Sequence, residues 1–327
     1  MKIVDDQLCT VIPLYKKEYF LATIRGVMAQ TVLPGELRIS DDSPGSFLIN
    51  DSNLQAALKN SLPGVKLSFS TGPKIGPMRN IRQLLALANL KNKYVHILLD
   101  DDLIWPNFYQ RHLAYLRESN AKCSVSLRFF IDETGSPIGS PAIPEDITSS
   151  REKYVSLDYI LIARSAIPSL NNWMGELSNS VFDGMSLLSL WNSPADFRAH
   201  GLEDIGTFAG FSKRNAAIFI CESLSCFRVS RSQNTQNKES DTWKAAVLGW
   251  VPLSQMALKD GAISQAEHYA CVQRVANIFD NYFKGSDPDT SRGLAQYLES
   301  GAKNNTIFDD LWANFLAKSP DYFARSA

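Results

Sequence analysis

The 327-residue sequence predicts an α/β fold, with a largely parallel central sheet flanked by helices and an α-helical C-terminal extension. Two observations predict it. Strand-type and helix-type runs alternate through residues 8–118, as they do in parallel sheets, and the strand-type runs are mostly apolar, as strands covered on both faces are. Beyond a polar, turn-rich stretch at residues 230–241, the regular segments have helical periodicity. We therefore divide the chain into residues 1–235 and 236–327.

The expected elements follow from the apolar runs and from the turn signals between them. Residues 8–14 (LCTVIPL) form the first strand and residues 18–30 an amphipathic helix. Further strands are expected at residues 35–40, 65–70, 94–99, 154–163 and 216–223. Further helices are expected at residues 53–60, 78–90, 107–118, 201–214, 243–258, 264–283, 291–302 and 307–315. Residues 129–150 are rich in Gly, Pro and Ser, which predicts a hairpin and loop.

Composition and charge exclude several classes of protein. The formal net charge is −1, and no cluster of basic residues suits a nucleic acid or an anionic membrane surface. The five cysteines are scattered, which predicts reduced thiols rather than disulfides or zinc. No apolar run reaches the roughly 18 residues of a membrane span, and acids near the N-terminus disfavour a secretion signal. We expect a cytoplasmic protein, with peripheral contact at the inner face of the membrane as the alternative.

Residues with chemical potential gather just after three of the expected strands. They are Pro13 and Tyr15, Asp41 and Asp42, and the triplet Asp100, Asp101 and Asp102. Ligands of open α/β sheets bind beyond the carboxyl ends of the strands. The shared placement therefore predicts a single binding site built from all three clusters.

The acidic triplet at residues 100–102 gives the sharpest chemical signal. If the strand geometry continues into it, Asp100 and Asp102 point to the same side, because strand side chains alternate with a period of two. Two converging carboxylates suit a hard divalent cation, and like charges this close are costly without a counter-ion. The pattern therefore predicts a metal site at Asp100 and Asp102, with a solvated acidic turn as the alternative.

Weaker candidates suit a nucleotide. A carboxylate of Asp41 or Asp42 can accept a hydrogen bond from a nucleobase N–H, and Tyr15 can stack on that base; a turn-forming role for the acids and a half-buried position for the tyrosine are the alternatives. Arg79 begins an expected helix, where a cation opposes the helix dipole. It suits an anionic or carbonyl-bearing ligand, with solvent exposure as the alternative.

Glu203 and Asp204 open the expected helix at residues 201–214. Acids are favoured in the first turn of a helix, so a structural role is one interpretation. The other is a general base that removes the proton from an acceptor hydroxyl.

Together these motifs resemble the family 2 glycosyltransferases of the GT-A fold, over about residues 8–235. The matching pieces keep the order of the family: TVIPLY at residues 10–15, QT at 30–31, ELRISDDS at 36–43, MRN at 78–80, the acidic triplet, YILIARS at 159–165, ED at 203–204 and FR at 227–228. The sequence departs from the family where Ser43 replaces the usual Gly after the acid pair. It also lacks a His after Arg228, and Arg231 takes that place as a possible phosphate ligand.

The resemblance implies a nucleoside-diphosphate sugar donor, usually a uridine one, bound by residues 1–128. The residues implied to surround the nucleoside are Thr10, Pro13, Tyr15, Arg79 and Asp42, with Asp41 as a substitute. Asp102, helped by Asp100, would bind Mg²⁺ or Mn²⁺ at the diphosphate, and Asp101 and Arg231 would also contact the donor.

For the acceptor half, residues 129–235, the resemblance implies an in-line displacement with inversion at the anomeric carbon. Asp204 would be the catalytic base and Glu203 its neighbour. The expected acceptor is a hydroxyl of a glycan or lipid-linked molecule, in the synthesis of bacterial surface polysaccharide.

The C-terminal region has apolar helix faces, of which Val272, Val275, Ile278 and Phe279 are examples. Packing in the core of the chain is expected. A homodimer formed through these helices, or contact with a membrane or carrier, is the alternative.

Two other functions remain open from the residues alone. One is a non-catalytic sugar-binding or scaffold subunit with the same fold. The other is a sugar nucleotidyltransferase, which typically begins with a Gly-rich basic loop, whereas residues 8–20 contain no Gly. A nicotinamide oxidoreductase is disfavoured, because no GxGxxG follows the first strand.

Overall fold

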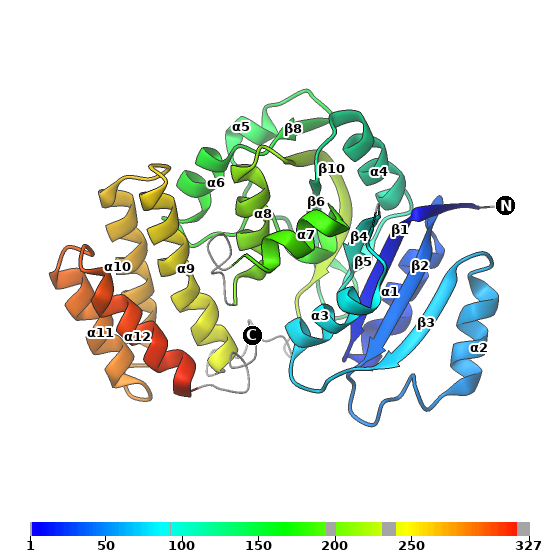
Figure 1. Ribbon diagram of the computed structural model, residues 1–327, viewed down its shortest axis with the longest axis horizontal. Helices are drawn as coiled ribbons and strands as arrows, with labels where there is room; N and C mark the ends of the chain where they lie inside the picture. Colours follow the sequence, from blue (N-terminus) through cyan, green and yellow to red (C-terminus); the bar gives the residue numbers. More distant parts are fainter. Residues whose placement is uncertain (1, 92, 194–200, 231–239, 319–327) are drawn as a thin grey trace. The chain divides into compact units, whose positions relative to one another are not determined.

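The computed structural model describes residues 2–91, 93–193, 201–230 and 240–318. Its sheet has the strand order β3-β2-β1-β4-β9-β6-β10-β5, with β7 and β8 paired to β6 and β10. Figure 1 shows β3, β2 and β1 side by side. The strands are β1 (Ile3–Leu14), β2 (Val32–Asp41), β3 (Lys66–Thr71), β4 (Tyr94–Ile97), β5 (Leu103–Ile104), β6 (Cys123–Ile131), β7 (Pro137–Gly139), β8 (Tyr154–Ser156), β9 (Ser180–Asp183) and β10 (Ala217–Arg228).

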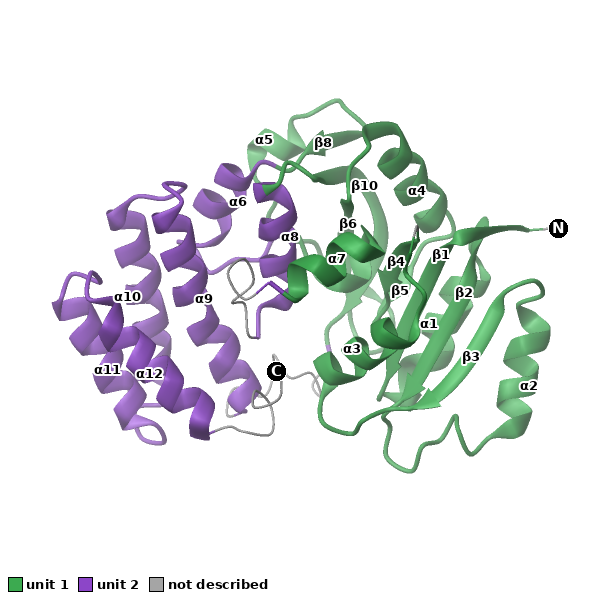
Figure 2. Ribbon diagram, in the orientation of Figure 1, with its two compact units in different colours: residues 1–157, 174–192, 214–229 green, residues 158–173, 193–213, 230–327 purple. Residues whose placement is uncertain are grey.

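The chain divides into two compact units, coloured separately in Figure 2. Unit 1 contains the sheet with α1 (Lys17–Met28), α2 (Ser52–Ser61), α3 (Pro77–Leu87), α4 (Phe108–Ser119), α5 (Glu145–Thr148), the 3-10 helix η1 (Leu177–Asn179) and α7 (Gly184–Trp191). Unit 2 contains α6 (Tyr159–Ala166), α8 (Glu203–Lys213), α9 (Asp241–Lys259), α10 (Gln265–Tyr282), α11 (Pro288–Glu299) and α12 (Asn305–Lys318). Two helices from the middle of the chain thus cluster with the C-terminal helices. The expected boundary at residues 235 and 236 lies outside the described residues.

One half of the sheet is parallel, as the sequence predicts. β1 lies between β2 and β4 and is parallel to both, and β3 is parallel to β2. In the other half, β9 runs antiparallel to both β4 and β6, while β6 and β10 are parallel. The carboxyl ends of β2, β1 and β4 therefore meet at one edge of the sheet.

β1 is covered on both faces, which explains its continuous apolar sequence. Ile12 and Leu14 belong to one core cluster with Phe20 of α1 and with residues of α4. Cys9 and Val11 are also buried and point to the opposite face, where α3 packs against β1. Burial of each large apolar side chain contributes about 1.5–3 kcal/mol, so this strand anchors the edge that carries the candidate site.

A chain of buried polar side chains crosses the core beside β1. The Tyr109 hydroxyl lies 2.8 Å from Thr10 Oγ1 and 3.1 Å from His96 Nδ1, and His96 Nε2 lies 2.9 Å from the carbonyl oxygen of Ser178. All of these side chains are buried. Burial lowers the pKa of His96 to about 4, so this histidine is neutral in the folded protein.

This lowered pKa predicts a loss of stability in acid. The unfolded chain takes up a proton on His96 near pH 6.5, whereas the folded chain does so only near pH 4. The stability that the folded protein gains from the neutral His96 is therefore complete above pH 6.5 and is lost as the pH falls towards 4. When the pH falls from 7 to 5, the contribution of His96 to the free energy of unfolding should decrease by about 2 kcal/mol. Urea unfolding at both pH values should show a correspondingly smaller difference for His96→Gln; an unchanged difference would contradict the assignment.

The strand expected at residues 154–163 is wrong beyond Ser156. Residues Tyr159–Ala166 form the helix α6, and the Asp158 side chain caps it by accepting a hydrogen bond of 2.9 Å from the Leu161 N–H. Ile162, Ala163 and Ala166 are its buried positions, which is a helical spacing. The run YILI resembles a buried strand by composition, and the Asp cap was the missed signal. The resemblance likens YILIARS at residues 159–165 to the strand before the acceptor site of the family, and this expectation is wrong as well, because these residues lie in α6.

The C-terminal helices bury the faces that the sequence singles out. Val272, Val275 and Phe279 are fully buried and Ile278 is half-buried, so core packing accounts for these residues. None of the described helices has both the length and the apolar character needed to cross a membrane.

Candidate active site

The candidate site lies at the carboxyl edge of β2, β1 and β4. Leu14, the last residue of β1, is opposite Asp41, the last residue of β2. Beyond β1, the backbone N–H groups of Tyr15 and Lys16 both donate to Asp100 Oδ2, at 2.5 Å each. The three clusters expected at strand ends thus lie at one edge of the sheet.

The acidic triplet lies in a turn rather than in a strand. β4 ends at Ile97, and the Asp102 N–H donates to the carbonyl oxygen of Leu99 at 3.3 Å. The Thr23 hydroxyl of α1 lies 2.8 Å from the carbonyl oxygen of Asp100 and 2.9 Å from that of Asp102, which ties the turn to α1. The alternation argument for Asp100 and Asp102 therefore does not apply, because its condition of continued strand geometry is not met.

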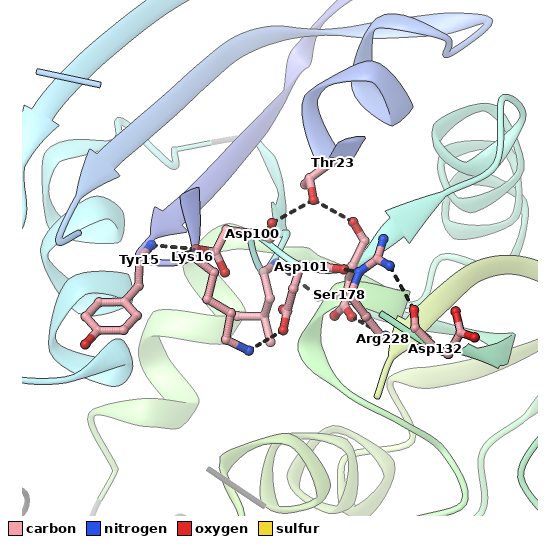
Figure 3. Close-up of polar contacts among 10 residues, drawn as sticks. Tyr15, Lys16, Thr23, Asp100, Asp101, Asp132, Ser178 and Arg228 are labelled. Carbon is pink, nitrogen blue, oxygen red and sulfur yellow. Dashed lines mark hydrogen bonds and ion pairs between the residues drawn. The ribbon is translucent and has the colours of Figure 1, made fainter. Parts of the chain in front are cut away.

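The three carboxylates have different partners, most of which Figure 3 shows. Asp100 holds the loop after β1, as described above. Asp101 Oδ2 forms an ion pair of 2.5 Å with Lys16 Nζ. Asp102 Oδ1 accepts a hydrogen bond of 3.1 Å from the backbone N–H of Arg228, whereas Asp102 Oδ2 is buried without a hydrogen-bond partner among the described residues.

The burial of these carboxylates makes their charged forms costly. Burial, and secondly the charge of Asp101, raises the pKa of Asp100 to about 7. Burial and then Asp101 also raise the pKa of Asp102 well above its ordinary value, while the Ser178 side chain and, more weakly, the hydrogen bond from the Arg228 N–H act in the opposite direction. A bound cation would remove this cost, since it favours the charged form of both groups.

Arg228 fixes the triplet from the end of β10. Its Nε donates to the carbonyl oxygen of Asp101 at 2.9 Å, and its Nη1 donates to those of Asp132 and Glu133 at 2.9 and 3.0 Å. The guanidinium also lies 4.7 Å from the centre of the Tyr19 ring. The triplet turn is therefore tied to the turn after β6 by one buried side chain.

A divalent cation fits this donor set only in part. The unpartnered Asp102 Oδ2 and the raised pKa of Asp100 and Asp102 are the features of carboxylates that lack a counter-ion. In the part of the chain that the structure describes, no group of three or more His, Cys, Asp or Glu side chains could hold a metal by itself. A cation here would need further oxygen ligands from a bound phosphate or water, as Mg²⁺ usually has.

Asp41 and Asp42, which the sequence could not rank, have different environments. Asp41 accepts four hydrogen bonds within its own loop: from the N–H and hydroxyl of Ser43 at 3.0 and 2.5 Å, and from the N–H groups of Leu48 and Ile49 at 2.8 and 3.1 Å. Asp42 Oδ1 accepts one, from the Lys74 N–H. Burial raises the pKa of Asp42. Asp42 is therefore the acid with capacity left for a ligand.

Gly72 determines where the Asp42 carboxylate lies. A Cβ atom at position 72 would be 2.5 Å from Asp42 Oδ1 and 2.8 Å from its Cγ, so any side chain there would displace the carboxylate. The Gly72 N–H also donates to the carbonyl oxygen of Asp41 at 2.9 Å.

The two acids should respond differently to truncation. Asp41→Ala should lower the free energy of unfolding by about 3 kcal/mol, because it leaves buried N–H groups unpaired, and should leave nucleotide affinity nearly unchanged in the folded fraction. Asp42→Ala should cost about 1 kcal/mol of stability and weaken binding of the uridine nucleotide expected from the sequence about tenfold. Urea unfolding and calorimetric titration of both variants check this; the reverse pattern would assign the base contact to Asp41.

Of the remaining candidates, Pro13, Tyr15 and Arg79 lie near this edge, whereas Thr10 does not. Pro13 is buried in β1, opposite Ser40, and Tyr15 just beyond it has 59% of its surface exposed, which leaves its ring free to stack. Arg79 is half-buried in the first turn of α3, after Gly76. Thr10 lies deeper in β1, fully buried, with its hydroxyl paired to Tyr109, and does not join the cluster.

The acceptor candidates belong to unit 2. Glu203 and Asp204 begin α8, as expected. Asp204 Oδ2 accepts a hydrogen bond of 2.8 Å from Asn172 Nδ2, and Glu203 Oε1 accepts one of 3.2 Å from the Gly201 N–H. Asn172 thus orients the Asp204 carboxylate, a role that sequence reasoning missed. Arg231 lies outside the described residues.

Comparisons with known proteins support the fold. No protein-family model and no curated protein matches the sequence. The structure is similar to TarS from S. aureus, a family 2 glycosyltransferase of the GT-A fold, with a TM-score of 0.53 and 14% identity over 88% of this chain. The chain spans about half of that protein, 47% of its length.

Crystal structures of TarS residues 1–349 in complex with UDP and with UDP-GlcNAc match with a TM-score of 0.48 and 12% identity each. They cover 86% and 94% of this chain and 73% and 92% of theirs. The likeness with a TM-score of 0.53, at 14% identity, shows the fold, which is GT-A with additional C-terminal helices.

Proposed function

We propose that this GT-A chain is a glycosyltransferase that uses a nucleoside-diphosphate sugar, with UDP as the nucleotide. One observation carries the proposal: an exposed aromatic ring, an acid with hydrogen-bonding capacity and a carboxylate triplet lie together beyond neighbouring parallel strands. Open α/β sheets bind nucleotides at this kind of edge.

The nucleoside would be bound by Tyr15 and Asp42. The exposed Tyr15 ring stacks on the base, and Asp42 accepts a hydrogen bond from a base N–H with the capacity that Lys74 leaves unused. Arg79, in the first turn of α3, donates to a carbonyl or phosphate oxygen of the donor, and Pro13 forms the floor. Thr10 supports this floor from within the core through Tyr109.

Asp100 and Asp102 would hold Mg²⁺ or Mn²⁺, with Asp102 Oδ2 as the oxygen that the protein leaves unpaired. The cation would supply charge stabilisation for the diphosphate as the sugar–phosphate bond breaks. Thr23 and Arg228 keep the triplet in position through its backbone carbonyl groups. Arg231 is proposed as a further phosphate ligand.

Asp204 would be the general base, with Glu203 beside it in the acceptor site. Asn172 holds one carboxylate oxygen of Asp204. The carboxylate takes the proton of the acceptor hydroxyl, the hydroxyl oxygen forms the new glycosidic bond, and the nucleoside diphosphate leaves from the opposite face with inversion. A glycan or lipid-linked acceptor in bacterial surface polysaccharide synthesis is the proposed context.

The test is calorimetric titration of the purified protein with UDP, in Mn²⁺ and in EDTA. Saturable binding that requires Mn²⁺ is expected, and a panel of UDP-sugars would then identify the donor. If only dTDP, GDP or CDP binds, the choice of base is wrong but the donor site stands. If none of the four nucleotides binds, the chain is better described as a non-catalytic scaffold.

A further inference from the structure

Lys16 is a charged residue of the site that no motif points to. It lies between β1 and α1, directly after Tyr15, and its backbone N–H is fixed by Asp100. Its ammonium group is paired with Asp101 Oδ2 at 2.5 Å (Figure 3). The exposed fractions of the two side chains are 18% and 8%, so solvent screens this ion pair only weakly.

The ammonium group of Lys16 and a divalent cation would compete for the same negative charge. Asp101 lies between Asp100 and Asp102 in one turn, and its charge is the second cause of the raised pKa of both. A cation held by Asp100 and Asp102 would satisfy part of the charge that now attracts Lys16, and would repel the ammonium group. Binding of the cation should therefore weaken the contact between Lys16 and Asp101.

A released Lys16 would still be held at the site by its backbone. Lysine carries its charge on a flexible four-carbon stem with three rotatable donors, and it is a common ligand of phosphate. The neighbouring Tyr15 is the proposed stacking residue for the base, so the stem begins next to the donor. A diphosphate brings negative charge to the same edge and offers the ammonium group a second partner.

We infer that Lys16 has two positions: it neutralises Asp101 in the donor-free protein and binds the diphosphate when cation and donor are both present. The inference rests on the proposed function. It makes the cation and the nucleotide bind cooperatively, because the cation releases Lys16 for the diphosphate and the diphosphate holds the ammonium group away from the cation. Such coupling is reciprocal.

The test compares Lys16→Met with Lys17→Met, a neighbouring lysine whose side chain is exposed. Free Mn²⁺ is followed by electron paramagnetic resonance without nucleotide, and UDP binding by calorimetry in saturating Mn²⁺. Lys16→Met should bind Mn²⁺ alone about fivefold more tightly, because a competing ammonium group is gone. It should bind UDP with Mn²⁺ about tenfold more weakly, because a charge-assisted hydrogen bond is lost. Lys17→Met should match the unmodified protein in both.

Asp101→Asn provides the converse measurement. It releases Lys16 without removing it, so UDP binding in saturating Mn²⁺ should become about fivefold tighter. Unchanged Mn²⁺ affinity in Lys16→Met would overturn the inference, even if UDP binding weakened, because it would mean that Lys16 does not compete with the cation. If the unmodified protein binds none of the nucleotides, the proposed function fails first and the inference falls with it.

Discussion

Asp102→Ala is expected to abolish Mn²⁺-dependent binding of UDP, with a loss of affinity of about a hundredfold or more. Asp102 Oδ2 is the buried oxygen that the described residues leave unpaired. The substitution removes the proposed cation ligand, while the folded protein loses the acceptor for the Arg228 N–H and the interaction with the Ser178 side chain. Calorimetric titration in Mn²⁺ and in EDTA measures the effect.

Asp102→Asn is the matched control for this experiment. Its side-chain oxygen can still accept from Arg228, so the turn is preserved while the charge is removed. It should lose Mn²⁺-dependent binding almost as completely as Asp102→Ala. Its thermal unfolding should show that it is at least as stable as the unmodified protein, because a buried charge is costly. Wild-type Mn²⁺ dependence in both variants would place the cation elsewhere.

Asp204→Asn is expected to lower kcat about a thousandfold without changing the affinity for UDP, because a general base typically contributes a factor of about 10²–10⁴. The amide can still accept from Asn172 Nδ2 through its oxygen, so the loss reports the missing base rather than a misplaced helix. Rates of transfer from the UDP-sugar that the donor panel selects, together with UDP titration, separate the two quantities.

Glu203→Gln is the neighbouring control for the catalytic base. Glu203 also lies in the first turn of α8 but accepts from the backbone at Gly201. Its substitution should lower the rate much less than that of Asp204. Equal rates for the unmodified protein and Asp204→Asn, under conditions where chemistry limits turnover, would remove Asp204 from the mechanism.

The sequence is sufficient to predict the parallel half of the sheet and the edge that carries the site. The runs at residues 8–14 and 94–99 are apolar on both faces, a pattern with few other solutions. Acids directly after such runs must then lie at the carboxyl edge. β9 escapes prediction because it has only four residues and lies within a region without clear periodicity.

The partners of the triplet could not be predicted, because they are distant in sequence. Ser178 Oγ accepts a hydrogen bond from the N–H of Leu99, the residue before the triplet, although the two are 79 residues apart in sequence. Arg228 is 126 residues from Asp102. Asp41 and Asp42 are adjacent in sequence, and only the course of the following loop decides which carboxylate accepts hydrogen bonds from backbone N–H groups. In α6 the deciding signal is local, because the Asp158 cap begins a helix although the composition of the run YILI favours a strand.

Gly72 has a consequence for any redesign of the base preference. Because its backbone lies against the Asp42 carboxylate, the space at position 42 has a fixed wall on one side. A library that exchanges Asp42 should therefore be restricted to short side chains such as Asn and Ser, and should keep position 72 constant. Evolutionary change of the base would face the same restriction: position 42 could change to a short side chain while Gly72 is kept, whereas a side chain at position 72 with Asp42 retained would displace the carboxylate.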